Sequence, residues 1–172
     1  MKVNTLFNIL NEFIDRFRDQ DNLRLYGEVE IKHIRNGRII KRKKLTNVIT
    51  DVGKAQVAGL IGGIVTDAFT YIAIGDGDSG NPGVCSSESS TDTALGHELQ
   101  RASATASRIT TSVTNDTLKL EATFNFTGSY SICESGVFDA ASNGNMLARK
   151  TFSVINVADG DSLQITWKIQ VQ

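Results

Sequence analysis

Two segments in the second half of the chain alternate strictly between apolar and polar residues, and this alternation limits the possible folds more than any other feature. Residues 118–126 place leucine, alanine or phenylalanine at every second position, and residues 163–171 alternate in the same way around Trp167. A period of two gives a strand one face in a core and one face toward solvent, which is typical of antiparallel sheets. The pattern predicts a mainly β protein.

Shorter strand candidates accompany these two segments. They lie at residues 69–74, 108–113, 129–133, 136–138 and 147–157. Turns rich in Gly, Asn and Asp separate them. Several short strands at this spacing indicate an antiparallel, jelly-roll-like β-sandwich over residues 65–172.

Residues 1–64 form the other predicted part, an N-terminal arm. Apolar residues recur three and four positions apart from Val3 to Phe17, which predicts an amphipathic helix. Its apolar stripe carries Phe7, Phe13 and Phe17, and these three are candidate partner-binding residues. The stripe either packs against its own domain or docks on a neighbouring subunit, and the sequence leaves both open.

A β-hairpin is predicted at residues 25–45, because Asn36-Gly37 suits the positive φ angles of a two-residue turn. This turn sets a register of three facing pairs: Ile34 with Ile39, Lys32 with Lys41, and Glu30 with Lys43. The pairing of Lys32 with Lys41 is repulsive unless an acidic group or another chain lies nearby.

The hairpin is the basic part of a chain whose charge is unevenly spread. Residues 1–60 hold 12 Lys and Arg against 7 Asp and Glu, whereas residues 61–172 hold 6 against 12. The candidate partner-binding cations lie on the second strand of the hairpin: Arg38, Lys41, Arg42 and Lys44. They form either a solvated charged surface or a docking patch for an acidic partner. No aromatic residue interleaves them for base stacking, so specific nucleic-acid binding is not expected.

A short second helix is predicted after the hairpin. Thr50 or Asp51 can cap its first turn, and Gly62-Gly63 should end it. Small residues such as Ala58 would allow close approach by whatever covers this helix.

The two cysteines, Cys85 and Cys133, lie far apart in the sequence and have no C-x-x-C spacing. This spacing indicates neither a disulfide scaffold nor a structural zinc site. We expect two reduced, partly buried thiols, which is how isolated cysteines usually behave.

Catalysis and cofactor binding are not indicated. The two histidines, His33 and His97, lie in no recognisable catalytic motif. The glycine- and aspartate-rich run at 75–83 follows a strand and lacks the glutamate that a calcium loop requires at its twelfth position. Glu134 and Asp139 have no nucleophile nearby in the sequence, so we expect turn-forming or buried hydrogen-bonded roles for them. The chain is predicted to be no enzyme and to need no cofactor or metal.

Membrane insertion and secretion are also not expected. No apolar run approaches the ~18 residues of a transmembrane helix. Glu12 and Asp15 lie where a signal peptide would have its apolar stretch.

Several stretches of the second part resemble a family of small virion structural proteins of tailed bacteriophages. These stretches are YIAIGDG at 71–77, TDTALGHEL at 91–99, ICESGVFD at 132–139 and MLAR at 146–149, followed by FSVINV at 152–157, GDSL at 160–163 and Thr166-Trp167. The similarity spans about residues 69–171. Members of this group are described as capsid decoration (cement) proteins or tail-fibre-like proteins, and the resemblance carries over no catalytic residues.

The resemblance implies a structural role on a virus particle. It predicts a decoration protein that binds and stabilises the outer face of the shell of major capsid protein as a homo-oligomer, commonly a homotrimer. Its expected location is the virion surface, after synthesis in the host cytoplasm. The alternative is a tail-fibre or baseplate appendage that attaches to the host surface through loops 75–90 and 140–146. No long repetitive shaft is visible in the sequence, and this favours the decoration protein.

Overall fold

The computed structural model describes residues 23–172, so the predicted N-terminal helix with Phe7, Phe13 and Phe17 lies outside the described residues. The described chain is mainly β with a short helix, as predicted. Its elements are β1 (Leu25–Arg35), β2 (Arg38–Thr46), β3 (Val48–Ile49), α2 (Asp51–Ile61), β4 (Tyr71–Gly75), β5 (Gly77–Asp78), β6 (Asn81–Pro82), β7 (Glu98–Ser103), β8 (Thr105–Ile109), β9 (Thr117–Asn125), β10 (Tyr130–Phe138), β11 (Met146–Val157) and β12 (Ser162–Val171).

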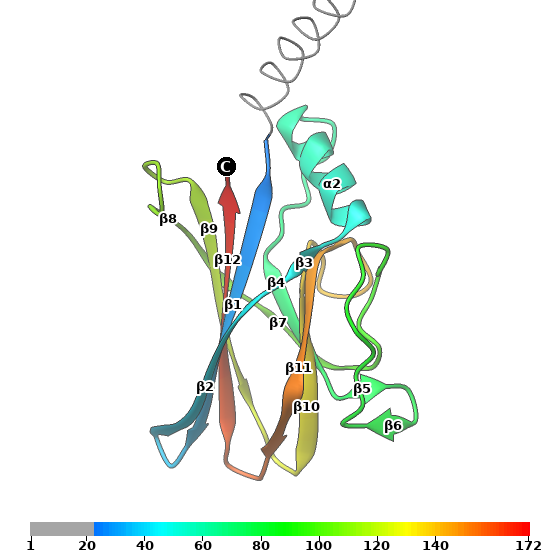
Figure 1. Cartoon of the computed structure of the whole chain (residues 1–172), viewed down its shortest axis with the longest axis vertical. Coiled ribbons are helices and arrows are strands. Elements are labelled where there is room, and N and C mark those ends of the chain that lie inside the picture. The colour runs from blue at the N-terminus through cyan, green and yellow to red at the C-terminus, as the bar shows by residue number, and fades with distance from the viewer. Residues whose placement is uncertain (1–22) are drawn as a thin grey trace, which may run out of the picture.

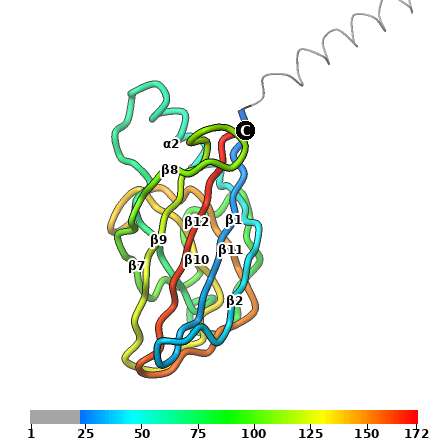
Figure 2. Tube along the Cα trace, turned by 90° about the vertical axis from the view of Figure 1, so that its left-hand side faces the viewer, coloured from blue at the N-terminus to red at the C-terminus, as the bar shows by residue number. Residues whose placement is uncertain are grey.

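The strands form two five-stranded sheets and one small two-stranded sheet. The first sheet has the order β2-β1-β12-β9-β8, the second has the order β3-β11-β10-β4-β7, and β5 pairs with β6 (Figure 1). Neighbouring strands run antiparallel throughout, which confirms the prediction from the period-two segments. In both views the long strands follow the long axis of the molecule, and the C-terminus lies beside the start of β1 (Figures 1 and 2).

The inner faces of the two large sheets share one hydrophobic core. Ile31 and Leu120 of the first sheet and Ile132 of the second are each fully buried within it. At its centre Trp167 donates a hydrogen bond through Nε1 to Ser135 Oγ at 3.2 Å, and this bond joins the two sheets. Because the polar groups of both residues are satisfied, the core accommodates them without an unpaired donor.

The hairpin of β1 and β2 belongs to the first sheet. β1 pairs with β12 from Leu25 to Ile34, so a strand that the sequence placed in the arm lies beside a strand of the predicted sandwich domain. The predicted pairing of Ile34 with Ile39 is confirmed.

The other two predicted pairs of the hairpin are wrong by one residue. Lys32 lies opposite Arg42, and Glu30 lies opposite Lys44. A register shift between His33 and Ile34 causes the difference, because a bulge makes two residues on one strand oppose one on the other.

Helix α2 follows β3 and packs beside β11. Thr50 is its N-cap: the Thr50 hydroxyl accepts a hydrogen bond from Gly53 N at 3.0 Å and donates to Met146 O. Gly53 faces β11 so closely that an added Cβ would lie 2.6 Å from Leu147 Cα. Gly62 caps the other end of the helix. The close approach fixes α2 over one end of the core.

Candidate docking surfaces

Strand β2 is one of the two edge strands of the first sheet, and most of its side chains are exposed. The four cations predicted to bind a partner all lie on it. Edge strands rich in Lys and Arg resist pairing with an identical edge, because the like charges repel. This edge therefore favours a partner of opposite charge.

Two of these four cations are paired within the chain. Lys44 Nζ lies 3.0 Å from Glu28 Oε1, and Arg42 donates through Nε to Glu30. Burial raises the pKa of Glu30, but the hydrogen bond from Arg42 and the nearby cations outweigh it and hold this pKa below its ordinary value. Arg42 and Lys44 are thus partly neutralised by β1.

The other two cations, Arg38 and Lys41, form no ion pair with any residue in the described range 23–172. Ile39 and Ile40 lie between them and are 56% and 52% exposed. The tip of the hairpin and the start of β2 therefore offer unneutralised positive charge next to exposed apolar surface.

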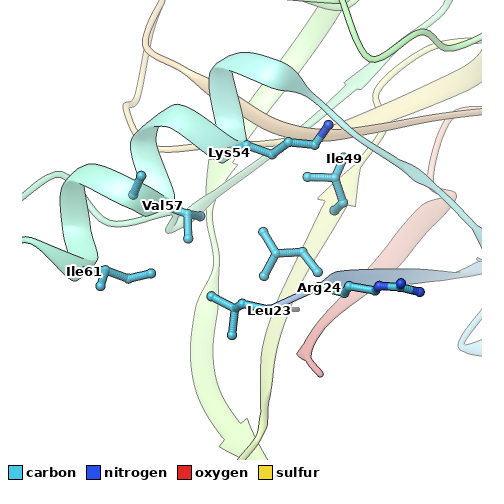
Figure 3. Close-up of a pocket in the computed structure, with 8 residues that line it drawn as sticks. Leu23, Arg24, Ile49, Lys54, Val57 and Ile61 are labelled. Atoms are coloured by element: carbon cyan, nitrogen blue, oxygen red, sulfur yellow. The ribbon is translucent and has the colours of Figure 1, made fainter. Parts of the chain in front are cut away.

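A second surface is an apolar pocket between α2 and the start of β1 (Figure 3). It has a volume of about 510 Å³, and its lining residues are Leu23, Arg24, Leu25, Ile49, Lys54, Val57, Ala58 and Ile61. Val57 and Ile61 project from α2 toward Leu23 (Figure 3). Leu23 and Ile61 are 62% and 70% exposed, although both are apolar.

A second hollow of about 380 Å³ shares Leu25 and Val57 with the first. Phe69 and Ile169 also line it. Apolar residues of α2 therefore line both hollows. Exposed apolar area of this kind commonly marks an interaction site. Val57 was recognisable from the sequence as apolar and Ala58 as small, but the pocket itself depends on how α2 and β1 meet.

The long loop between β6 and β7 is fastened to the second sheet by a disulfide, which corrects the expectation of two free thiols. Cys85 of this loop is bonded to Cys133 of β10, and their Cα atoms are 6.0 Å apart. The sequence did not indicate this disulfide, because Cys85 and Cys133 are 48 residues apart and meet only when the loop folds back across β10.

A buried ion pair fastens the same loop a second time. Glu134 on β10 is fully buried and accepts hydrogen bonds from Arg149 Nε at 3.0 Å and Nη2 at 2.7 Å. Its carboxylate also accepts from the backbone N–H groups of Gly96 and His97, both at 3.1 Å. Arg149 in turn reaches Asp92 in the loop at 2.8 Å.

The three sequence stretches 91–99, 132–139 and 146–149 thus meet at one structural clamp, formed by Glu134, Arg149 and the loop residues 92–97. Glu134 has the buried hydrogen-bonded role that was expected. Asp139 accepts from Asn145 N at 2.7 Å and Asn145 Nδ2 at 2.8 Å, which is the expected turn-forming role. These residues hold the fold together.

Glu88 holds the loop at a third point. Its carboxylate binds Lys150 and accepts from the backbone N–H of Thr151 at 3.2 Å. Burial raises the pKa of Glu88, but the hydrogen bonds from Lys150 and Thr151 outweigh it and lower this pKa to about 2. A carboxylate whose pKa is lower in the folded than in the unfolded protein stabilises the fold at pH values above the unfolded pKa. This stabilisation is lost as the pH falls toward the folded pKa.

We therefore expect Glu88→Gln to lower the stability at neutral pH and to lose less further stability than the wild type between about pH 5 and pH 2. Urea unfolding midpoints at neutral and acidic pH measure both effects. Asp159→Asn, at an exposed turn, serves as the control. An identical pH dependence of Glu88→Gln and wild type would contradict the role given to Glu88.

Within the described part of the chain, no group of three or more His, Cys, Asp or Glu is arranged to hold a metal ion. No helix among these residues is long and apolar enough to cross a membrane.

Comparison of the chain with family models, with curated proteins and with solved structures gives no match in any of the three. Any assignment of function therefore depends on the surfaces themselves and on the phage-like stretches of the sequence.

Proposed function

We propose that this chain is a non-enzymatic structural protein of a tailed-phage virion, a capsid decoration (cement) protein on the outer face of the major capsid shell. In this proposal the two sheets act as a jelly-roll-like β-sandwich module. Residues 1–64, whose strands β1 and β2 belong to the first sheet, make the contacts between subunits. The observation that carries the proposal is the unneutralised positive charge of Arg38 and Lys41 on an exposed sheet edge.

The charge distribution suits binding to an acidic lattice of repeated subunits. Arg38 and Lys41 offer charge that no acidic side chain of the described residues takes up, and Ile39 and Ile40 add apolar contact area beside them. A decoration protein binds only the assembled shell, so each contact stabilises that assembly by mass action. A homotrimer would present three such edges at once, and linked contacts strengthen binding well beyond a single site.

The alternative is a tail-fibre or baseplate appendage that attaches to the host surface. One observation favours it: the two candidate receptor loops are held firmly. The disulfide and the Glu134–Arg149 pair fasten loop 75–90 and its continuation. In loop 140–146, Arg101 Nη1 donates to Ala140 O at 2.9 Å and to Asn143 O at 2.7 Å. Rigid loops lose less entropy on binding a receptor.

Charge reversal on β2 tests the decoration role. We expect Arg38→Glu with Lys41→Glu to weaken binding to capsids that lack the protein by at least about tenfold, which corresponds to ~1.4 kcal/mol. Occupancy measured by co-sedimentation over a range of protein concentrations gives the affinity.

The matched control is Arg108→Glu, compared with Lys41→Glu alone, because Arg108 is an exposed cation on β8, the other edge strand of the same sheet, and is in no ion pair with the described residues. This control should bind nearly as well as the wild type. Equal binding by all three proteins would remove β2 as the docking surface.

A further inference from the structure

We propose that a polar pocket at the end of the molecule opposite α2 binds a neutral saccharide through one of its sugar rings. The pocket lies where the ends of β1 and β11 and the start of β10 meet the loop after β4, and in Figure 1 these strand ends are at the bottom and α2 is at the top. Its volume of about 470 Å³ is within the range of small-molecule sites, roughly 300–1,000 Å³. The inference goes beyond the proposed function, because the site involves neither a capsid nor an oligomer.

Tyr130, the first residue of β10, gives this pocket an aromatic wall that the core holds in place. The centre of its ring lies 5.9 Å from that of the buried Phe126, and the two ring planes are tilted by 44°. Tyr130 is nonetheless 38% exposed, so part of its ring remains open to a ligand. The C–H groups of a sugar ring form an apolar face that packs against an aromatic ring. Because Phe126 already holds the ring of Tyr130, little conformational entropy is lost when a ligand packs on it.

Two side chains of the pocket are fixed by hydrogen bonds within the protein and each keep a donor free. Arg35 donates to Asp161 through Nε and Nη2, both at 2.7 Å, and its Nη1 makes no hydrogen bond to any described residue. Asn156 accepts through Oδ1 from Ser131 Oγ at 3.0 Å, which leaves its Nδ2 group without a partner among the described residues. The pocket therefore offers two donors whose side chains are already oriented.

Asp76, which directly follows β4, supplies an acceptor. Its side chain is only 10% exposed, and its Oδ1 lies 2.6 Å from Nδ1 of His97, to which it is hydrogen-bonded. Its Oδ2 accepts no hydrogen bond from any residue of the described range 23–172. Most of the hydration of this carboxylate is already lost in the folded protein. A hydrogen bond from a ligand hydroxyl therefore costs little further desolvation.

These groups together select a neutral polyhydroxyl ligand. A hydroxyl group both donates and accepts, so neighbouring hydroxyls of one sugar ring can accept from Arg35 and Asn156 and donate to Asp76. Asp76 repels an anionic ligand, and Arg35 repels a cationic one. An aromatic wall beside this mixed set of donors and acceptors matches the apolar face and the polar edge of a sugar ring.

Titration of isotope-labelled full-length protein with single sugars, followed by nuclear magnetic resonance, tests the site. Glucose, galactose, mannose and N-acetylglucosamine are the neutral probes, and glucuronate is the acidic one. We expect at least one neutral sugar to shift the backbone amide signals of residues 129–131 and 156–158. A Kd in the millimolar range is expected for so small a ligand.

Variants of the pocket test which side chains hold the sugar. Tyr130→Ala should weaken binding by about tenfold or more, because it removes the aromatic wall, whereas Tyr130→Phe keeps the ring and should bind within about twofold of the wild type. Asn156→Ala changes an exposed residue, so the fold should be kept, and it should also weaken binding. The matched control is Tyr26→Ala, because Tyr26 is a 50% exposed tyrosine near the start of β1, at the other end of the molecule. This control should bind as the wild type does.

Other results would overturn the saccharide site. If no neutral sugar shifts the signals of residues 129–131 and 156–158, the pocket binds no sugar ring. If Tyr130→Ala and Asn156→Ala both bind as tightly as the wild type, the sugar lies elsewhere on the molecule. If glucuronate alone binds, the pocket selects an anion. Lys41→Glu should keep the wild-type affinity for sugar although it is expected to weaken binding to capsids, so the site and the proposed function are tested separately.

Discussion

Removing the Cys85–Cys133 disulfide should lower the free energy of unfolding by about 4 kcal/mol, the chain-entropy value for a loop of this length. The bridge joins residues 48 positions apart and ties the loop between β6 and β7 to β10. Without the bridge, the unfolded chain has a higher conformational entropy, which stabilises the unfolded state relative to the fold. For a chain of this size, a loss of this order corresponds to a fall in Tm of roughly 10 °C.

The measurement is thermal and urea unfolding of the double variant Cys85→Ser with Cys133→Ala. Alanine suits position 133 because this residue is buried, whereas Cys85 is partly exposed. Wild-type protein treated with a reductant should match the variant, while the variant itself should not respond to the reductant. Equal stability of the variant and the oxidised wild type would show that the bridge does not hold the loop.

Breaking the buried ion pair should have an effect of similar size. Arg149→Met leaves the fully buried Glu134 carboxylate without its cation, and removing one partner of such a pair costs about 3–5 kcal/mol. The backbone N–H groups of Gly96 and His97 remain as donors, but they do not neutralise the charge. Urea unfolding at neutral pH measures the loss.

Two controls distinguish the cost of leaving a buried charge unpaired from the effect of removing a cation. Lys54→Met removes a cation from an exposed pair with Asp51, in which both side chains are 57% exposed, and should leave the urea midpoint nearly unchanged. The double variant Glu134→Leu with Arg149→Met removes both buried charges and should be more stable than Arg149→Met alone. If Arg149→Met is as stable as the wild type, the clamp does not hold the loop to the second sheet.

The disulfide also bears on the proposed location of the protein on the virion. Thiols are kept reduced in the cytoplasm, whereas disulfides persist in oxidising surroundings. A virion protein made in the host cytoplasm would therefore close the Cys85–Cys133 bridge after the particle leaves the cell. The loop would gain its full attachment on the released particle.

The antiparallel sheets were predictable because their signal is local. Residues 163–171 alternate with a period of two, and Leu163, Ile165 and Trp167 are all fully buried. The turn at Asn36-Gly37 was equally local, since both residues have positive φ angles of 50° and 72°. Such features depend only on near neighbours in the sequence.

The features that sequence analysis missed depend on contacts between distant segments. The bulge at His33 shifted the hairpin register, and the sequence gives no sign of it. Cys85 meets Cys133 only after the loop folds across β10. The pocket beside α2 exists only where the helix meets the start of β1. Among the predicted contact residues on β2, Arg42 and Lys44 are in ion pairs with β1. Arg38 and Lys41 are in none with the described residues.

The most direct measurement adds purified full-length protein to virus particles that lack it and locates the added density by electron microscopy. A capsid decoration protein should give density that repeats at lattice positions over the whole head. Density confined to the tail, or no binding to the head together with adhesion to host cells, would contradict that role and identify an appendage.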